Sequence, residues 1–224
     1  MKKNIVIVGT SRGIGKQLVA LLADDNNVLA LSRNTAPLKA FEKNTNVNIE
    51  TFDVSKDDLS VLIKKHFKQV DVLINNAGYL VNKPILDITL KDIEQSYQTN
   101  VFGLIKNCQA VIPFMQQKGG HIVNVGSMGG FQGSVKFPGL SIYSSSKAAV
   151  ASFTECLAEE LKDTKIKTNC LALGAAQTEM LAEAFPDYKA PLSAKKMAEF
   201  IADFSLNSHQ WINGKVIPVS LSTP

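Results

Sequence analysis

Tyr143 and Lys147 are residues whose types and spacing indicate proton chemistry. Because they stand four positions apart in a predicted helix, their side chains project from the same face. An isolated tyrosine has a pKa of about 10 and exchanges protons poorly at neutral pH, but a nearby ammonium favours the phenolate and should lower that pKa. The pair therefore predicts a phenol that gives or takes a proton, although the same spacing also occurs on ordinary helix surfaces.

A glycine-rich segment lies between the first predicted strand and the helix that follows it. Glycine lets the backbone turn tightly and approach a pyrophosphate, and a helix N-terminus adds unpaired N–H groups and a partial positive charge. This position in a strand-loop-helix unit predicts dinucleotide binding. The contact residues expected here are Gly9, Ser11, Arg12, Gly13, Ile14 and Gly15.

The end of the second predicted strand indicates which dinucleotide is preferred. NAD-selective sites carry an acid about 20 residues past the loop, to hold the ribose 2′-hydroxyl. Here the segment reads Leu31-Ser32-Arg33-Asn34 and holds no carboxylate. Arg33, helped by Arg12 in the loop, can instead bind a 2′-phosphate through charge-assisted hydrogen bonds. The sequence thus predicts NADP(H) over NAD(H), with Ser32 and Arg33 at the site; the alternative is that both arginines are solvated surface residues.

Short β-branched runs alternate with helical patterns along the chain. We expect strands at residues 5–8, 27–31, 47–52, 70–74, 122–125, 165–172 and 216–219, and helices at 14–24, 37–43, 56–67, 89–117, 143–161 and 193–204. This alternation predicts an α/β fold with one parallel sheet covered by helices on both faces. The strands at 5–8, 70–74 and 122–125 are apolar almost throughout and should be central. We expect a single domain over residues 1–224, a Rossmann-type doubly wound parallel sheet flanked by helices.

The GxxxGxG spacing of the glycine loop resembles that of the short-chain dehydrogenase/reductase family, and later motifs extend the resemblance over nearly the whole chain. These motifs are Asp53-Val54, Asn75-Asn76-Ala77-Gly78, Thr99-Asn100-Val101-Phe102-Gly103, Ser127, Tyr143-x-x-x-Lys147 and Gly174 to Thr178. Two positions depart from the family pattern. Val8 replaces a threonine before the first glycine, which removes one side-chain hydrogen bond. Leu173 replaces a proline, so the loop after the sixth strand loses a fixed φ.

The resemblance implies a catalytic set of Asn100, Ser127, Tyr143 and Lys147. In the family the serine hydrogen-bonds the substrate oxygen, which preorganises the site for the charge that develops there. The tyrosine delivers the proton, and the lysine also reaches the ribose hydroxyls. The asparagine holds a kinked backbone whose carbonyl binds a water that leads to the lysine.

The resemblance also implies further cofactor contacts at the ends of the strands. Asp53 and Val54 would contact the adenine, although Asp53 could instead cap a helix. The loop after the sixth strand would hold the carboxamide, while Asn75 would bond across the sheet. The remaining contacts expected from the resemblance are Asn76, Ala77, Gly78, Tyr143, Lys147, Gly174, Ala176 and Thr178.

The implied activity is reversible hydride transfer between a nicotinamide and a small-molecule carbonyl or alcohol substrate, with the tyrosine as general acid and base. The alternatives on the same fold are a non-catalytic NADP-binding sensor or scaffold, and a different reaction such as isomerisation or water loss. Family members usually pair through their long central helices, so a homodimer or homotetramer is implied.

Two loops could form the walls of a substrate pocket. The segment between Ser127 and Tyr143 is longer than usual for the family, and its Phe131 and Phe137 are either pocket contacts or part of a surface excursion. Residues 179–191 correspond to a short version of the family's mobile lid. Its apolar side chains, which include Met180, Leu181 and Phe185, favour either an uncharged substrate face or simple helix packing.

Composition limits the other possibilities. The net charge of +4 is mild and the basic residues are scattered, unlike the clustered basic face of a nucleic-acid-binding protein. No run approaches the roughly 18–20 apolar residues that span a bilayer, and the N-terminal apolar run is too short for a signal core. We therefore expect a cytoplasmic protein with no nucleic-acid or membrane partner.

Cysteine and histidine positions give no metal-binding pattern. The three cysteines, which we expect to be small buried residues in a reducing compartment, are Cys108, Cys156 and Cys170. His66, His121 and His209 lie far apart in the sequence and are interpreted as structural or surface residues.

Overall fold

Seven parallel strands form one sheet in the order β3-β2-β1-β4-β5-β6-β9 in the computed structural model, which describes residues 2–221. The strands are β1 (Asn4–Val8), β2 (Asn27–Ser32), β3 (Val47–Thr51), β4 (Val72–Asn75), β5 (Gly120–Val125), β6 (Ile166–Leu173) and β9 (Val216–Val219). The chain first builds outward from β1 to β3 and then returns to build outward from β4. The predicted doubly wound parallel sheet is confirmed, with β1, β4 and β5 inside it. Ligands bind such sheets where the strand order reverses, which here is between β1 and β4.

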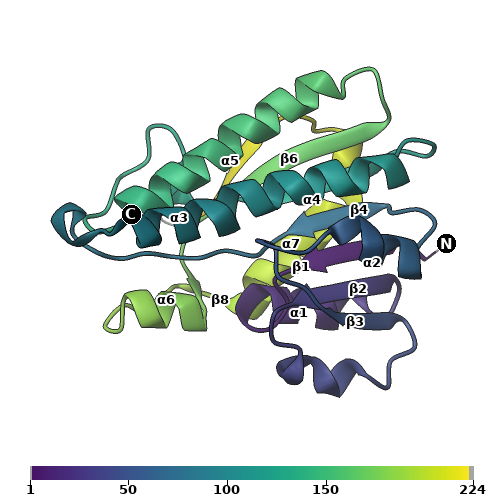
Figure 1. The fold of residues 1–224 in the computed structure, drawn as a ribbon, viewed down its shortest axis with the longest axis horizontal. Helices are drawn as coiled ribbons and strands as arrows, with labels where there is room; N and C mark the ends of the chain where they lie inside the picture. Colours follow the sequence, from purple (N-terminus) through teal and green to yellow (C-terminus); the bar gives the residue numbers. More distant parts are fainter. Residues whose placement is uncertain (1, 222–224) are drawn as a thin grey trace.

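Helices cover both faces of the sheet (Figure 1). On one face lie α1 (Gly13–Leu22) and α7 (Ala194–Asn207), and on the other lie α2 (Leu59–His66), α4 (Gly103–Val111) and α5 (Ser141–Glu160). Side chains alternate along β1, so Ile5 and Ile7 join the core under α1 and α7, while Val6 and Val8 join the core under the other three helices. This two-sided burial explains why the central strands read as continuous apolar runs.

The long helical region expected over residues 89–117 is present, but it is divided into four successive segments. Helix α3 (Leu90–Tyr97) passes into a π-helical turn (Gln98–Phe102), which is followed by α4 and then by a 3₁₀ turn (Ile112–Phe114). Asn100 lies within the π-helical turn and binds the backbone of a neighbouring loop, as described below. Pro113 lies in the 3₁₀ turn, where its missing N–H cannot continue the α-helix.

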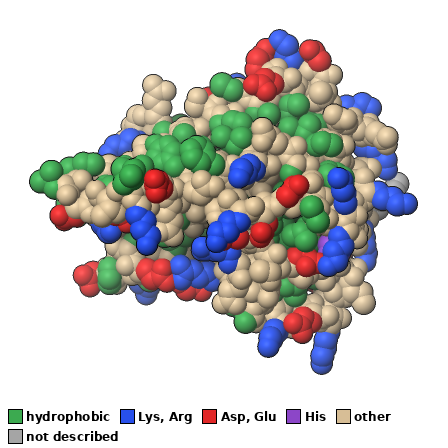
Figure 2. Space-filling model, in the orientation of Figure 1, with side chains coloured by type: hydrophobic (Ala, Val, Ile, Leu, Met, Phe, Trp, Pro, Cys, Tyr) green, Lys and Arg blue, Asp and Glu red, His purple; other side chains and the backbone are tan. Residues whose placement is uncertain are grey.

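Shorter elements complete the description. They are α6 (Glu179–Ala184), the paired strands β7 (Ala176–Gln177) and β8 (Leu192–Ser193), and 3₁₀ turns at Ala36–Phe41, Ile85–Asp87, Met128–Gly130 and Ser208–Gln210. The predicted short helix over 37–43 is thus a 3₁₀ turn. On the face drawn in Figure 2, lysine and arginine side chains are interspersed with aspartate and glutamate.

The cysteine prediction holds for two residues and is wrong for one. Cys108 and Cys170 are buried, but Cys156 is exposed because it lies on the solvent side of α5. Within residues 2–221, no group of three histidine, cysteine, aspartate or glutamate side chains could hold a metal ion. In the same range no helix has both the length and the apolar character needed to cross a bilayer.

Candidate active site

A cleft of about 550 Å³ lies at the carboxyl ends of the central strands. It gathers nearly all of the residues that the sequence singled out. Those that line it are Gly9, Ser11, Arg12, Gly13, Ile14, Ser32, Arg33, Asp53, Val54, Asn76, Ala77, Gly78, Ser127, Tyr143, Lys147, Gly174, Ala176 and Thr178. Two predicted residues, Gly15 and Asn100, are not part of the lining.

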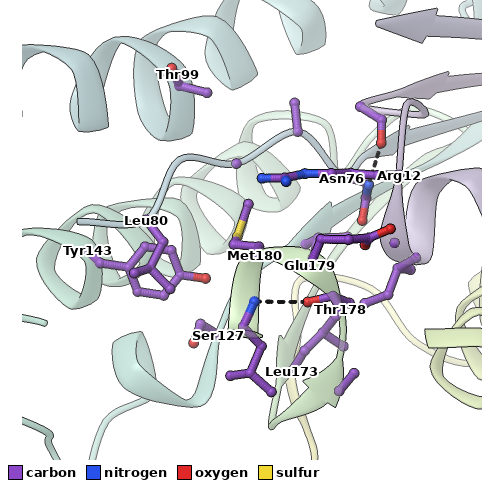
Figure 3. Close-up of a pocket in the computed structure, with 18 of the residues that line it drawn as sticks. Arg12, Asn76, Leu80, Thr99, Ser127, Tyr143, Leu173, Thr178, Glu179 and Met180 are labelled. Atoms are coloured by element: carbon purple, nitrogen blue, oxygen red, sulfur yellow. Dashed lines mark hydrogen bonds between the residues drawn. The ribbon is translucent and has the colours of Figure 1, made fainter. Parts of the chain in front are cut away.

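The glycine loop packs so closely on the loop after β4 that side chains are excluded. Gly9 has a φ of +93°, and a Cβ there would lie 2.6 Å from the backbone of Ala77. Asn76 Nδ2 donates to the Gly9 carbonyl at 2.8 Å (Figure 3). A Cβ on Gly15 would lie 1.9 Å from the same carbonyl, so Gly15 lets α1 pack beneath the loop instead of lining the cleft.

A buried threonine anchors the start of this loop even though Val8 replaces the family threonine. Thr10 is fully buried, and its Oγ1 donates to the Leu31 carbonyl at 3.1 Å. The Gly9 N–H donates to the same carbonyl at 2.8 Å. The loop therefore has a side-chain anchor two positions after Val8.

The residues at the end of β2 line the cleft, and none of them carries a carboxylate. Ser32 Oγ donates to the Asn34 carbonyl at 2.7 Å, and the exposed Arg33 side chain follows it along the cleft. Asp53, which stands two residues past the end of β3, accepts hydrogen bonds from the Ser55 N–H at 3.0 Å and from the Ser55 hydroxyl at 2.6 Å. Asp53 thus both orders its own turn and lines the cleft.

Arg12 forms an ion pair in this structure. Its guanidinium donates through both terminal nitrogens to the Glu183 carboxylate of α6, with Nη2 and Oε2 at 2.9 Å. The hydrogen bond raises the pKa of Arg12 and lowers that of Glu183. Glu179 stands close by, because a Cβ on Gly13 would lie 3.5 Å from its carboxylate. Helix α6 therefore places two carboxylates beside the glycine loop.

Ser127, Tyr143 and Lys147 meet at the other end of the cleft. Ser127 directly follows β5, and the other two residues stand one turn apart near the start of α5. Burial raises the pKa of Tyr143, and a side-chain hydrogen bond with Ser127 partly offsets this rise. Figure 3 shows the two side chains close together in the cleft.

The expected lowering of the Tyr143 pKa by Lys147 is wrong. Lys147 Nζ lies 5.9 Å from the centre of the tyrosine ring and donates to the Val125 carbonyl at 2.7 Å. Burial lowers the pKa of Lys147 to about 8. The cost of burying a charged group dominates for both residues, so the phenol is held in its protonated form.

Asn100 lies behind the cleft and connects three elements. Its Oδ1 accepts from the Tyr79 N–H at 2.8 Å, and its Nδ2 donates to the Tyr79 carbonyl at 2.9 Å and to Ser146 Oγ at 2.9 Å. The Ser146 hydroxyl donates in turn to the Tyr143 carbonyl at 2.7 Å. Asn100 thereby fixes the first turn of α5 relative to the loop after β4.

Comparison with known proteins agrees with this geometry. The family model described as short chain dehydrogenase matches residues 3–189. The chain belongs to the short-chain dehydrogenase family. It is 34% identical over 190 residues to carbonyl reductase family member 4 of Xenopus laevis, covering 82% of this chain and 79% of the relative. It is 35% identical over 192 residues to the diacetyl reductase [(S)-acetoin forming] of Staphylococcus epidermidis, covering 80% of this chain and 74% of the relative.

A solved structure shares the overall architecture. The structure of ElxO with NADP bound superposes with a TM-score of 0.85 at 27% identity and covers 98% of this chain and 97% of that chain. The match extends beyond the region of the family model, so it includes α7 and β9, which complete the sheet and its helical cover.

In this short-chain dehydrogenase the predicted bond of Asn75 across the sheet is confirmed. Asn75 Nδ2 donates to Asn124 Oδ1 at 2.9 Å, and Asn107 Nδ2 donates to Asn75 Oδ1 at 3.0 Å. Asn124 Nδ2 donates to Thr154 Oγ1 at 2.9 Å. This buried chain ties β4, β5, α4 and α5 together beneath the cleft, and its polar atoms satisfy one another.

Thr178 caps α6 at the edge of the dehydrogenase cleft. Its Oγ1 accepts from the Leu181 N–H at 3.2 Å. Gly174 lies against the C-terminal segment, since a Cβ there would be 2.4 Å from Ser220 Oγ. Leu173, which replaces the family's proline, directly precedes Gly174. Packing against Ser220 therefore holds the loop next to this replacement.

Sequence patterns missed part of the cleft lining. Phe137 lines the cleft as one alternative predicted, but Phe131 does not. The lining residues that the sequence patterns did not single out include Leu80, Leu140 and Tyr188. Leu80 stands two residues past Asn75-Asn76-Ala77-Gly78, and Leu140 stands three residues before Tyr143. For Leu80 and Leu140, the available signal was their proximity to these motifs. Tyr188 lines the cleft only because the segment over residues 179–191 folds against it.

Proposed function

We propose that this short-chain dehydrogenase is an NADP(H)-dependent oxidoreductase that transfers a hydride reversibly between the nicotinamide and a carbonyl or alcohol group. The proposal rests on the arrangement of the cleft. Ser127, Tyr143 and Lys147 meet at one end of it, and the glycine loop and two arginines lie at the other end. The NADP bound to ElxO and the reductase names of the relatives support it.

The cleft fits a dinucleotide through its backbone. The close approach of Gly9 to Ala77 leaves the glycine loop bare of side chains where a pyrophosphate would rest, and the N-terminus of α1 follows at once. Arg33 and Arg12 would hold the 2′-phosphate, while Gly174 to Thr178 would lie near the carboxamide. When bound, the cofactor supplies the hydride.

The protein's own residues position the substrate and move the proton. Ser127 polarises the carbonyl oxygen, and Tyr143, whose raised pKa keeps it protonated, donates its proton to that oxygen. Lys147 then serves the return of a proton to Tyr143, and Asn100 holds the turn that carries both residues. A single domain over residues 1–224, a cytoplasmic location and a homodimer or homotetramer remain predictions.

Replacement of Tyr143 by phenylalanine tests the proposal. A general acid contributes roughly 10²–10⁴-fold, so we expect Tyr143→Phe to lose about 10³-fold in turnover of aldehydes and ketones. NADPH affinity, measured by fluorescence titration, should stay within a few-fold. Tyr97→Phe is the matched control, since the Tyr97 hydroxyl bonds Ser145 Oγ and does not line the cleft. Equal activity of Tyr143→Phe and wild type would refute the acid role, and NADPH binding with no turnover by the wild type would favour the sensor or scaffold.

A further inference from the structure

We propose that the substrate of this enzyme is a neutral, hydrophobic carbonyl compound, without a carboxylate or phosphate near its reacting carbon. This inference rests on the proposed function and deepens it by naming the substrate class. It follows from the half of the cleft beyond Ser127 and Tyr143, here called the apolar half. Its walls are Leu80, Phe137, Leu140, Met180, Phe185 and Tyr188.

Three segments far apart in the sequence supply these walls. Leu80 comes from the loop after β4, Phe137 and Leu140 come from the loop before α5, and the remaining three come from α6 and the turn that follows it. Figure 3 shows Leu80, Tyr143 and Met180, which all line the cleft. The reacting carbonyl would therefore meet hydrocarbon on the sides that Ser127 and Tyr143 leave open.

Hydrogen bonds hold the three segments together. Asn82 Nδ2 donates to the Ala184 carbonyl at the end of α6, at 2.8 Å. The Lys83 N–H donates to the Gly139 carbonyl at 3.0 Å. Gly139 has a φ of +83°, and a Cβ there would lie 2.1 Å from Asn82 Oδ1. The side chains of the apolar half thus face one cavity because their backbones are joined, and Met180 and Phe185 do more than pack α6.

The charged residues of the cleft lie elsewhere. The charged side chains that line it are Arg12, Arg33, Asp53, Lys147 and Glu179. All of these except Lys147 belong to the glycine loop, to the ends of β2 and β3, or to the start of α6 beside Gly13. The Lys147 ammonium donates a hydrogen bond to the Val125 carbonyl.

Two lysines near the apolar half, Lys83 and Lys136, are also held by other groups. Lys83 Nζ pairs with Asp92 at 2.8 Å, and Lys136 Nζ donates to the Phe131 carbonyl at 2.7 Å. Among the described lining residues, the apolar half therefore offers a substrate anion no cation of its own. A carboxylate held against these side chains would lose part of its hydration without a compensating partner.

The reaction on such a substrate balances with the groups already named. One hydride from NADPH forms a C–H bond at the carbonyl carbon while the C=O π bond breaks, and one proton from Tyr143 goes to the oxygen. The products are a neutral alcohol and NADP⁺, and Tyr143 regains its proton from solvent.

A pair of ketones that differ only in charge tests the substrate class. Methyl 5-oxohexanoate and 5-oxohexanoate share a methyl ketone that three methylenes separate from the ester or carboxylate, so their intrinsic reactivities are close. We expect kcat/KM, followed by NADPH absorbance, to be at least tenfold higher for the ester.

Met180→Lys provides the converse test, with Met180→Gln as its uncharged control of similar length. The added cation should pair with the substrate carboxylate and raise kcat/KM for 5-oxohexanoate relative to the ester by at least tenfold, whereas Met180→Gln should not. NADPH affinity, measured for each variant, reports whether the cleft remains folded.

Each outcome decides one of the two proposals. If wild type uses 5-oxohexanoate as well as the ester, or better, the substrate class is wrong while the oxidoreductase function stands. Equal effects of Met180→Lys and Met180→Gln on the two substrates would also overturn it. If NADPH binds but neither these nor other ketones and aldehydes are turned over, the proposed function itself fails.

Discussion

Tyr143 and Lys147 both lie where burial opposes their charged forms. For the tyrosine this keeps the proton on the phenol, which suits a proton donor in carbonyl reduction. For the lysine it lowers the pKa to about 8, close to physiological pH. The lysine can therefore exchange its proton readily, which an ammonium with an ordinary pKa could not.

The pH dependence of carbonyl reduction should report this lysine. Because kcat/KM reflects ionisations of the free enzyme, we expect it to fall as pH rises through about 8, where Lys147 loses its proton while Tyr143 keeps its own. Lys147→Arg retains its charge at all accessible pH values, so any residual activity should show no fall there. The same alkaline fall in wild type and variant would assign the ionisation to another group.

At the scale of elements, α6 lies over the glycine loop through Arg12 and Glu183. The pair is exposed on both sides, with 46% and 60% of the side chains accessible, so it is a weak interaction. It nevertheless occupies the guanidinium proposed to hold the 2′-phosphate. If Arg12 binds the 2′-phosphate as proposed, NADPH competes with Glu183 for Arg12, and α6 loses that contact when the cofactor binds.

Glu183→Gln should strengthen NADPH binding. Exposed ion pairs are weak, so relief of the competition should lower the dissociation constant by only a few-fold, up to about fivefold. NADH, which has no 2′-phosphate, should respond less. Asp187→Asn removes a charge from the same exposed segment and serves as the control. Unchanged or weaker NADPH binding in Glu183→Gln would show that Arg12 does not meet the phosphate.

At the scale of the whole molecule, a buried histidine joins the helical layer to the sheet at the edge opposite the cleft. His121 lies near the start of β5, and its Nδ1 is 3.0 Å from the Ser205 carbonyl of α7. Its Nε2 is 3.0 Å from Asn169 Nδ2 of β6. Burial lowers the pKa of His121 to about 4, with smaller lowering contributions from His209 and Lys3 against the raising effect of the Ser205 carbonyl.

Stability should therefore fall in mild acid. The unfolded histidine, with a pKa of about 6.5, binds a proton that the folded one excludes, so this contribution is fully present above pH 6.5 and is lost as pH falls toward 4. We expect a loss of about 2 kcal/mol between pH 7 and 4.5, measured by urea unfolding. Glutamine at position 121 can keep both hydrogen bonds but does not titrate. The free energy of unfolding of His121→Gln should therefore fall less over the same pH range, by the amount assigned to His121. Equal losses in the two proteins would contradict the assignment.

The sequence by itself determined the layered architecture and most of the candidate site. Apolar runs such as Ile5 to Val8 specify strands buried on both faces, and the glycine spacing specifies the loop that follows. Strand ends in a parallel sheet meet at one edge, so local motifs at Asn76, Ser127 and Gly174 had to converge. Local patterns suffice to predict strands, helices and the loops at their ends, because the repeating backbone geometry of each element sets which way its side chains point.

Only the tertiary structure decided the electrostatics and the walls of the cleft. The pKa of Tyr143 depends on surrounding atoms from several elements, and their combined burial outweighs the helical spacing to Lys147. The pairing of Arg12 joins residues 171 positions apart. Desolvation and long-range contacts arise from how layers pack, and no short window of sequence contains that information.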